Sequence, residues 1–164
     1  MASSDFLLKI DEISGESAQE GKTDYVDIES WSWGAMNSGS MAQGGGGGTG
    51  KVSCNDYHFV CKNGRSAMQA FGHCAKGSHL QNAILECRKA GGDAKTYTYY
   101  TVKFEKIVIS SYQEGGSGGS DLLPMAQISF NYQKVTVEYF EQDAKGKVSS
   151  KGSRFYDQSK GVGG

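Results

Sequence analysis

The sequence lacks long apolar runs and any excess of charge of one sign. No apolar stretch approaches the about 20 residues that a membrane-spanning helix requires. The formal net charge is -1, from 17 basic and 18 acidic side chains, which gives no general attraction to nucleic acid or to an anionic membrane. Residues 1–17 also lack the basic region, apolar core and cleavage site of a secretory signal, so we expect no Sec-dependent export. The function classes that remain involve neither nucleic acid nor membrane.

Motifs of common catalytic and metal sites are missing as well. There is no G-x-S-x-G nucleophile elbow. The stretch from Gly45 to Lys51 matches the G-x-x-x-x-G-K of a phosphate-binding loop, but Val52 stands where Ser or Thr must ligate Mg²⁺, and a strand-like segment follows. The candidate metal ligands also lack the spacing of a structural zinc site. They are His58, Cys61, His73, Cys74, His79 and Cys87. We therefore expect no catalytic residue, no metal and no cofactor.

Length and glycine content set the domain organisation. The 164 residues suit one domain, 1–164. The 24 glycines cluster at 44–48, 115–119 and 161–164, which predicts loops at the first two clusters and a flexible tail over 158–164. The four cysteines have no paired C-x-x-C spacing, and we expect reduced thiols because no secretory signal is present.

Alternation of apolar and polar residues dominates the chain and predicts β-strands. Residues 5–11 alternate, residues 79–93 favour a strand over a helix, and residues 147–159 read as a last strand. The two long strands predicted at 99–110 and 127–140 each change the parity of their apolar positions part-way. Such a change indicates a bulge or a corner in a curved sheet.

One segment has the apolar spacing of a helix. In "SAMQAFGHCAKG", Ala67, Ala70, Phe71 and Cys74 recur at i, i+3, i+4 and i+7. Ser66 is the expected N-cap, and Gly77 the expected C-terminal stop. Many strands with a single helix predict a mainly β protein, a small β-barrel of two packed antiparallel sheets with one α-helix on its side.

Two tryptophans precede the Gly-rich loop. By alternation, Val26 and Ile28 face one way, and Tyr25, Trp31 and Trp33 the other. Neither face is purely polar, so both sides of this strand are expected to meet other groups. The tryptophans form either a second core layer or a subunit contact, since both environments favour large aromatic side chains.

Several segments resemble the Hcp (hemolysin-coregulated protein) family of the type VI secretion system. They are "DFLLKIDEISGES" from Asp5, "DIESWSWG" from Asp27, "DYHFVCKNGRSAMQAFGHCAKGSHLQNAILECRKAGG" from Asp56, and "ISFNYQKVTVEYFEQD" from Ile128. The most specific parts are I-x-G-E-S at 13–17, "SWSWG" at 30–34, and H-L-x-x-A-x-L-x-x-R-K-A-G from His79. In order and spacing, the resemblance covers about residues 5–157.

The resemblance implies a small barrel that assembles into a homohexameric ring with a wide central hole. It further implies that rings stack into a tube, which a contractile sheath propels, a trimeric spike caps, and small effector proteins occupy. Such a subunit stays in the bacterial cytoplasm before firing, is secreted by the system itself without a signal peptide, and is not an enzyme.

The same resemblance assigns the 35–51 loop to contact with a neighbouring ring. The ring-stacking residues it implies are Ala35, Met36, Asn37, Ser38, Met41, Gln43, Gly44, Gly45, Gly46, Gly47, Gly48 and Lys51. Trp31 and Trp33 would anchor the base of this loop and contribute to the subunit interface. Two other hypotheses remain: a monomeric β-barrel that binds a small apolar ligand in its mouth and, more weakly, a nucleotide-binding enzyme that uses Lys51.

Overall fold

The computed structural model describes residues 5–39, 51–92, 95–119 and 123–164. The mainly β class with one helix is confirmed. No helix in these ranges is both long and apolar enough to cross a membrane. In chain order the elements are β1 (Asp5–Ile10), β2 (Val26–Ile28), β3 (Ser30–Ser32), β4 (Ala35–Asn37), β5 (Val52–Cys54), β6 (Tyr57–Lys62), α1 (Arg65–Lys76), β7 (His79–Ala90), β8 (Thr96–Gly115), β9 (Met125–Gln142), β10 (Val148–Asp157) and β11 (Val162–Gly163).

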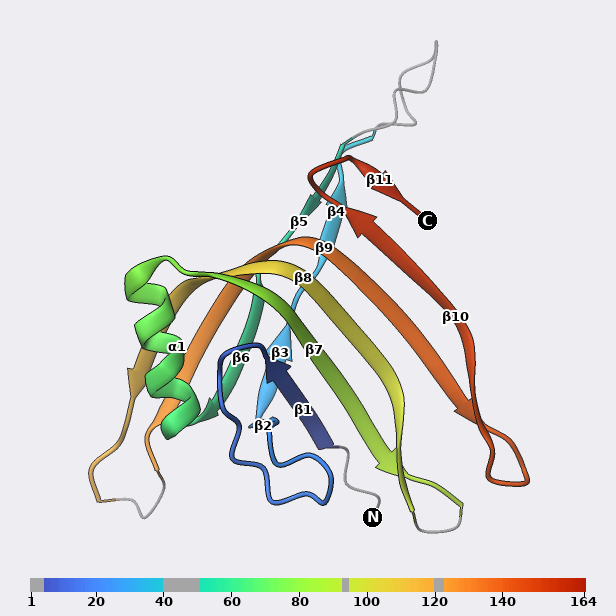
Figure 1. Ribbon diagram of the computed structural model, residues 1–164, viewed down its shortest axis with the longest axis horizontal. Coiled ribbons are helices and arrows are strands. Elements are labelled where there is room, and N and C mark those ends of the chain that lie inside the picture. Colours follow the sequence, from blue (N-terminus) through green and yellow to red (C-terminus); the bar gives the residue numbers. More distant parts are fainter. Residues whose placement is uncertain (1–4, 40–50, 93–94, 120–122) are drawn as a thin grey trace.

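Nine strands form one antiparallel sheet that curls into an open barrel (Figure 1). Its main path runs β11-β10-β9-β8-β7-β1-β2, while β6 and β3 branch from β9. The same edge of β9 pairs with β6 over 125–130 and with β10 over 134–142. Near the two ends of the sheet, the Glu29 N–H donates to the Val60 carbonyl at 2.8 Å. No ladder of the described strands joins β2 to β3, so the barrel stays open there.

A corner runs across the three long strands at Gln81, Lys106 and Gln133. The register is the same on both sides of it, so no strand carries an extra residue there. Lys106 instead adopts the left-handed conformation, with φ of 54°. The buried cross-strand rows on the two sides of the corner are Ala83–Phe104–Val135 and Leu80–Ile107–Tyr132. The predicted parity change is therefore a corner shared by three strands, which turns both halves of the sheet toward one core.

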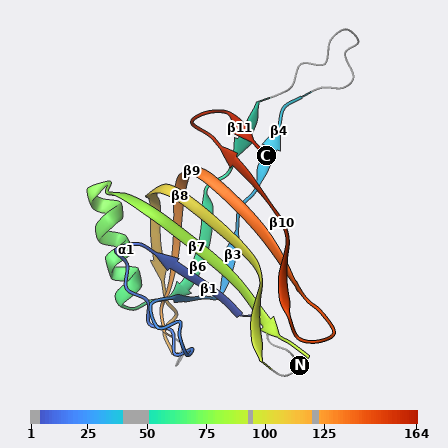
Figure 2. The same cartoon turned by 45° about the vertical axis from the view of Figure 1, so that its right-hand side comes forward.

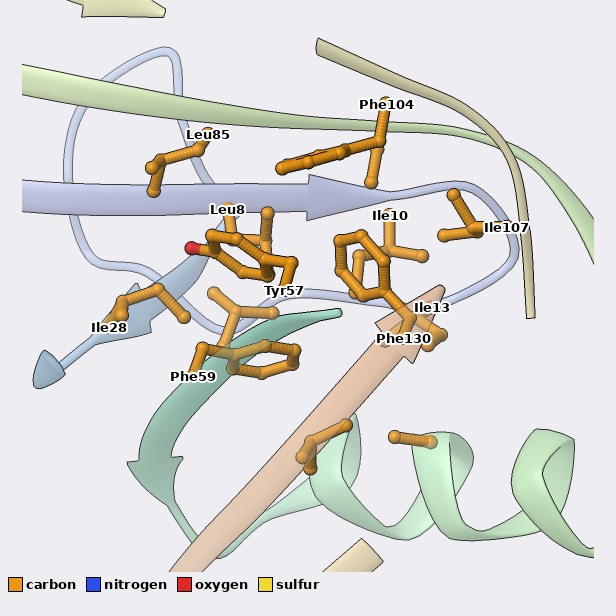
Figure 3. Close-up of a cluster of buried hydrophobic side chains, with 14 of the residues drawn as sticks. Leu8, Ile10, Ile13, Ile28, Tyr57, Phe59, Leu85, Phe104, Ile107 and Phe130 are labelled. Atoms are coloured by element: carbon orange, nitrogen blue, oxygen red, sulfur yellow. The ribbon is translucent and has the colours of Figure 1, made fainter. Parts of the chain in front are cut away.

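Aromatic rings fill the core beneath this corner (Figure 3). Tyr57 is completely buried, and its ring centroid lies 5.0 Å from those of Phe104 and Phe130. Tyr57, Phe59 and Cys61 alternate toward this core along β6. Because these residues come from strands far apart in the sequence, the core joins the whole length of the chain.

The expected opposition of Val26 and Ile28 to Trp31 and Trp33 is wrong. The chain bends at Glu29, where β2, which pairs with β1, gives way to β3, which pairs with β6. The bend reverses the parity, so both tryptophans pack against the core that contains Val26 and Ile28.

Helix α1 lies along one side of the sheet and packs against β8 (Figure 2). Ala67 and Ala70 are buried and Cys74 is partly buried, as the spacing predicts. Phe71 is 55 % exposed, with its ring 5.4 Å from that of Tyr112. Gly77 ends the helix in the left-handed conformation, with φ of 64°, which confirms the predicted stop.

The predicted N-cap at Ser66 is wrong, because the helix already begins at Arg65. Gly64 is the N-cap and has no side chain to bond the first turn. Glu16 supplies this bond from another part of the chain: its Oε1 accepts from the Arg65 N–H at 3.1 Å. Ser66 Oγ donates to the Ser14 carbonyl at 2.7 Å. A carboxylate suits this position, since helix N-termini carry free N–H groups and a partial positive charge.

Gly15 explains the glycine of the I-S-G-E-S motif. A Cβ atom at this position would lie 2.2 Å from the Tyr25 carbonyl carbon. The Gly15 N–H donates to the Asp24 carbonyl at 3.2 Å, so the two backbone segments are held in contact. Glycine at position 15 therefore lets the backbone pack directly against that of Tyr25, and the neighbouring Glu16 bonds to the first turn of α1.

The last residues fold back on β10. Val162 and Gly163 form β11, opposite Asp157 and Tyr156. The Phe155 N–H donates to the Gly164 carbonyl at 2.8 Å. The flexibility of residues 158–164 stays a prediction.

Candidate assembly surface

A two-stranded arm projects from the curled sheet. Among the described strands, β4 and β5 pair only with each other, in the register Ala35↔Cys54, Met36↔Ser53 and Asn37↔Val52. The arm extends away from the rest of the molecule at the end opposite the β8–β9 connection (Figure 1). Met36 is 68 % exposed, the highest value among the large hydrophobic side chains described. The arm therefore presents an accessible apolar side chain away from the sheet.

Only part of the predicted ring-stacking segment can be placed. Ala35, Met36 and Asn37 lie in β4, Ser38 follows it, and Lys51 immediately precedes β5. The other members of the predicted set lie outside the described residues: Met41, Gln43, Gly44, Gly45, Gly46, Gly47 and Gly48. The segment predicted as a loop therefore begins as a strand.

The joint between arm and sheet is fixed by hydrogen bonds. The Asn55 N–H donates to the Gly34 carbonyl at 2.8 Å. The Tyr132 hydroxyl donates to the Asn55 carbonyl at 2.8 Å. Burial raises the pKa of the Tyr132 phenol and that of the Cys54 thiol, so both groups are protonated near neutral pH. The Tyr132 donor therefore persists under physiological conditions.

Trp31 and Trp33 pack inward at the base of the arm. Trp31 stacks on Tyr57 at 6.2 Å between ring centroids. Trp33 lies edge-on to Phe104 at 6.2 Å and to Tyr132 at 6.5 Å. Both side chains are half-buried, so they form the second core layer that was one of the two alternatives. A role for their exposed parts in a subunit interface stays a prediction.

An apolar groove opens beside the arm. We call it the arm-base groove; it has a volume of about 240 Å³. It is lined by Trp33, Ala35, Val52, Cys54, Val135, Val137, Arg154, Phe155 and Tyr156. Arg154 is the one charged residue in this lining, and its Nη1 donates to the Ser153 carbonyl at 2.7 Å.

A larger hollow of about 490 Å³, with both polar and apolar side chains in its lining, lies over β3, β6, β8 and β9. Ser32, His58, Ser129 and Ser111 form one row across these strands. Ser110 Oγ donates to Asp56 Oδ2 at 2.7 Å. No hydrogen bond in the described part of the chain joins His58 to a hydroxyl, so no base is positioned to activate a serine. Hydroxyl, amide and imidazole groups suit this surface for polar contacts with another molecule.

Metal binding finds no support in the described ranges. No group of three or more histidine, cysteine, aspartate or glutamate side chains gathers there. All four cysteines are free, and Cys61 and Cys87 are buried in the core.

Comparison with known proteins assigns this architecture to a family. The model of the family "Type VI secretion system effector, Hcp" matches residues 7–139. The chain is 37% identical over 142 residues to protein hcp1 of Pseudomonas aeruginosa, which covers 87% of this chain and 86% of that protein. The chain belongs to the Hcp family. The family comprises structural proteins of type VI secretion and not enzymes, which makes this chain a type VI secretion protein.

Solved structures of Hcp-family proteins share the fold. A type six secretion system protein superposes with a TM-score of 0.88 at 27% identity, over 99% of this chain and 100% of that chain. Hcp1 from Salmonella typhimurium gives 0.74 at 25% identity, over 99% of each chain. A type VI secretion system effector from Yersinia pestis gives 0.71 at 27% identity, over 93% of this chain and 99% of that chain.

Two features of this Hcp-family chain were not predicted from its sequence. The arm-base groove combines residues from the arm, β9 and β10, and no local pattern joins these segments. Its best sequence signal is the pair Val135 and Val137, which alternate in β9 just beyond the corner. The bond from Glu16 to the first turn of α1 spans 49 residues, so no local capping pattern could indicate it.

Proposed function

We propose that this protein is the ring-forming subunit of the type VI secretion tube. Six copies form a ring, rings stack into a tube, and the lumen carries small effector proteins. The observation that carries this proposal is the family match over residues 7–139. The projecting β4–β5 arm adds support, because a subunit that stacks needs a surface that reaches beyond its own ring.

The proposed partners are other copies of this chain, a trimeric spike protein, a contractile sheath and small effectors. The protein stays in the bacterial cytoplasm until the sheath contracts, and the machine then secretes it without a signal peptide. The net charge of -1 favours neither nucleic acid nor membrane as a partner.

In this proposal the 35–51 segment makes the contact between rings. Met36 and Lys51 are its described residues best suited to an apolar and a charged contact, respectively. Trp31 and Trp33 hold the arm at a fixed angle by packing against the core, and their exposed parts contribute to the subunit interface. Glycines 44–48 allow close approach to a neighbour, at an ordering cost of roughly 1–2 kcal/mol for each residue fixed.

Secretion from the protein's own bacterium tests the proposal. We expect the chain in the culture medium of cells with an active type VI system, and not of cells that lack the contractile sheath. A cytoplasmic marker enzyme controls for lysis. Equal release from both strains would contradict the proposed function.

The arm-base groove favours one second candidate, a monomeric barrel that binds a small apolar ligand. Its volume of about 240 Å³ falls below the roughly 300–1,000 Å³ typical of small-molecule sites. A monomer that retains an apolar molecule through purification would support this alternative.

A further inference from the structure

We infer that Leu123 of one copy enters the arm-base groove of a second copy, which makes a head-to-tail contact between them. This inference rests on the proposed function, because it names the contact that accompanies the arm when copies stack. The residue that fills the groove then comes from another copy of the same chain.

The groove is suited to a side chain more than to a cofactor or metabolite. Its lining is apolar except at Arg154, and it offers few groups that could orient a polar ligand. Its volume of about 240 Å³ is small for a ligand site, which usually spans roughly 300–1,000 Å³. Val135 and Val137 shape it from β9 and Val52 from the arm, so it exists only where arm and sheet meet.

Leu123 is a fitting occupant. It is 59 % exposed, so its side chain is accessible to another molecule, and it immediately precedes Pro124 and β9. The next backbone group is held in place, since the Asn63 N–H donates to the Pro124 carbonyl at 2.8 Å. An apolar side chain on a restrained backbone can insert with little further ordering.

The two surfaces lie at opposite ends of the molecule. The end of β8 and the start of β9 lie away from β4 and β5 (Figure 1), and Leu123 lies two residues before β9. A contact between different surfaces at opposite ends does not close on two copies, because each copy keeps one free groove and one free Leu123. Such a contact gives a closed ring if its rotation closes and an open stack if it does not, and the inference concerns the second case.

The charges around the two surfaces are complementary. Near the groove, Arg154 and Lys51 form no ion pair with any described residue. Leu123 edges a hollow of about 220 Å³ that also contains Glu16, Asp27 and Glu29. Lys62 and Arg65 pair with Glu29 and Glu16, which leaves Asp27 without an ion-pair partner among the described residues. Opposite charges at the rims would orient the approach of the two copies.

Cys54 allows a direct test, because it lines the groove and is free. In Leu123→Cys, the new thiol would lie beside Cys54 of the next copy. Treatment with diamide, which accepts the two electrons and two protons of the thiols, should form an intermolecular disulfide. A disulfide requires Cα atoms about 4.4–6.8 Å apart, so the reaction reports close contact.

We expect a ladder of dimers, trimers and higher multimers on a non-reducing gel. Leu123→Cys combined with Cys54→Ser should give no ladder. Met68→Cys, a matched control at another exposed side chain, should give none either, since Met68 is 63 % exposed but lies on α1. A Leu123→Ser variant should form rings with at least tenfold fewer stacks in electron micrographs.

Two results separate failure of this inference from failure of the proposed function. Stacked rings without a Cys54-dependent ladder would overturn the inference and leave the tube function standing. Protein that remains monomeric at millimolar concentration, or that carries a small apolar adduct in native mass spectrometry, would overturn both.

Discussion

At the scale of single residues, Lys106 holds the conformation that sets the shape of the sheet. A lysine with φ of 54° lies in a region that non-glycine residues rarely adopt. Its neighbours in register, Gln81 and Gln133, continue the corner across β7 and β9. The long side chain points to solvent, so the position demands a backbone conformation and not a buried contact.

Lys106→Val should therefore destabilise the protein by about 1–3 kcal/mol, because a β-branched residue resists the left-handed conformation. Lys103→Val is the matched control, at an exposed position in the regular part of β8, and should change stability by less than about 0.5 kcal/mol. Urea unfolding measures both variants. Equal effects would show that the corner does not depend on this conformation.

Buried thiols predict a loss of stability at alkaline pH. Burial raises the pKa of Cys61 to about 11 and that of Cys87 to about 12, from 9.0. The folded state favours the protonated thiols, so their contribution is complete below pH 9 and is lost as the pH rises toward 11–12. Each thiol contributes at most about 1.4 kcal/mol per pH unit in this window. The Cys61→Ala and Cys87→Ala double variant should show a shallower decline between pH 9 and 11 in urea unfolding; an unchanged slope would contradict this assignment.

At the scale of elements, helix α1 depends on a segment far away in the sequence. Residues 14–17 supply the carboxylate and the carbonyl that satisfy its first turn. The helix itself contributes buried alanines and a C-terminal glycine, both of which its sequence predicts. The motif I-S-G-E-S thus has a structural role, and a substitution in it should affect the helix.

Glu16→Ala should lower the free energy of unfolding by about 1 kcal/mol, the typical loss for a removed N-cap bond. Glu20→Ala, an exposed carboxylate in the same connection, is the control and should have little effect. Hydrogen exchange of the first turn of α1 locates the change. Unaltered exchange there in Glu16→Ala would contradict the capping role.

The arm is the second element whose role can be isolated. Deletion of Gly44–Gly48 should impair tube growth and preserve rings, because glycines have no side chain that a core could bury. Replacement of the five glycines by serines keeps the length and should retain most of the stacking. Electron micrographs count rings and tubes in each variant. Normal tubes after the deletion would exclude this segment from the contact between rings.

Strands and helix could be predicted because their signals are local. Alternation identifies β1, residues 79–93 and 147–159 are correctly predicted as strands, and the spacing of Ala67, Ala70 and Cys74 identifies α1. The orientation of Trp31 and Trp33 could not be predicted, since one bend at Glu29 changes the strand's partner and reverses its faces. The arm-base groove and the bond from Glu16 depend on tertiary contacts that no local pattern contains.

At the scale of the whole molecule, one curled sheet presents two different ends. One surface has the arm and the arm-base groove, near which Arg154 and Lys51 form no ion pair with a described residue, and the other has Leu123 beside several carboxylates. Both surfaces leave apolar side chains accessible to water, and contact between copies would bury them. We propose that the arrangement of these two surfaces serves contact between copies in the tube.

The mass of the purified, reduced protein tests the ring directly. Light scattering coupled to size exclusion should give about six times 17.6 kDa, with ring-shaped particles in electron micrographs of the same peak. A single species of 17.6 kDa at every concentration up to the millimolar range would contradict the ring-forming subunit.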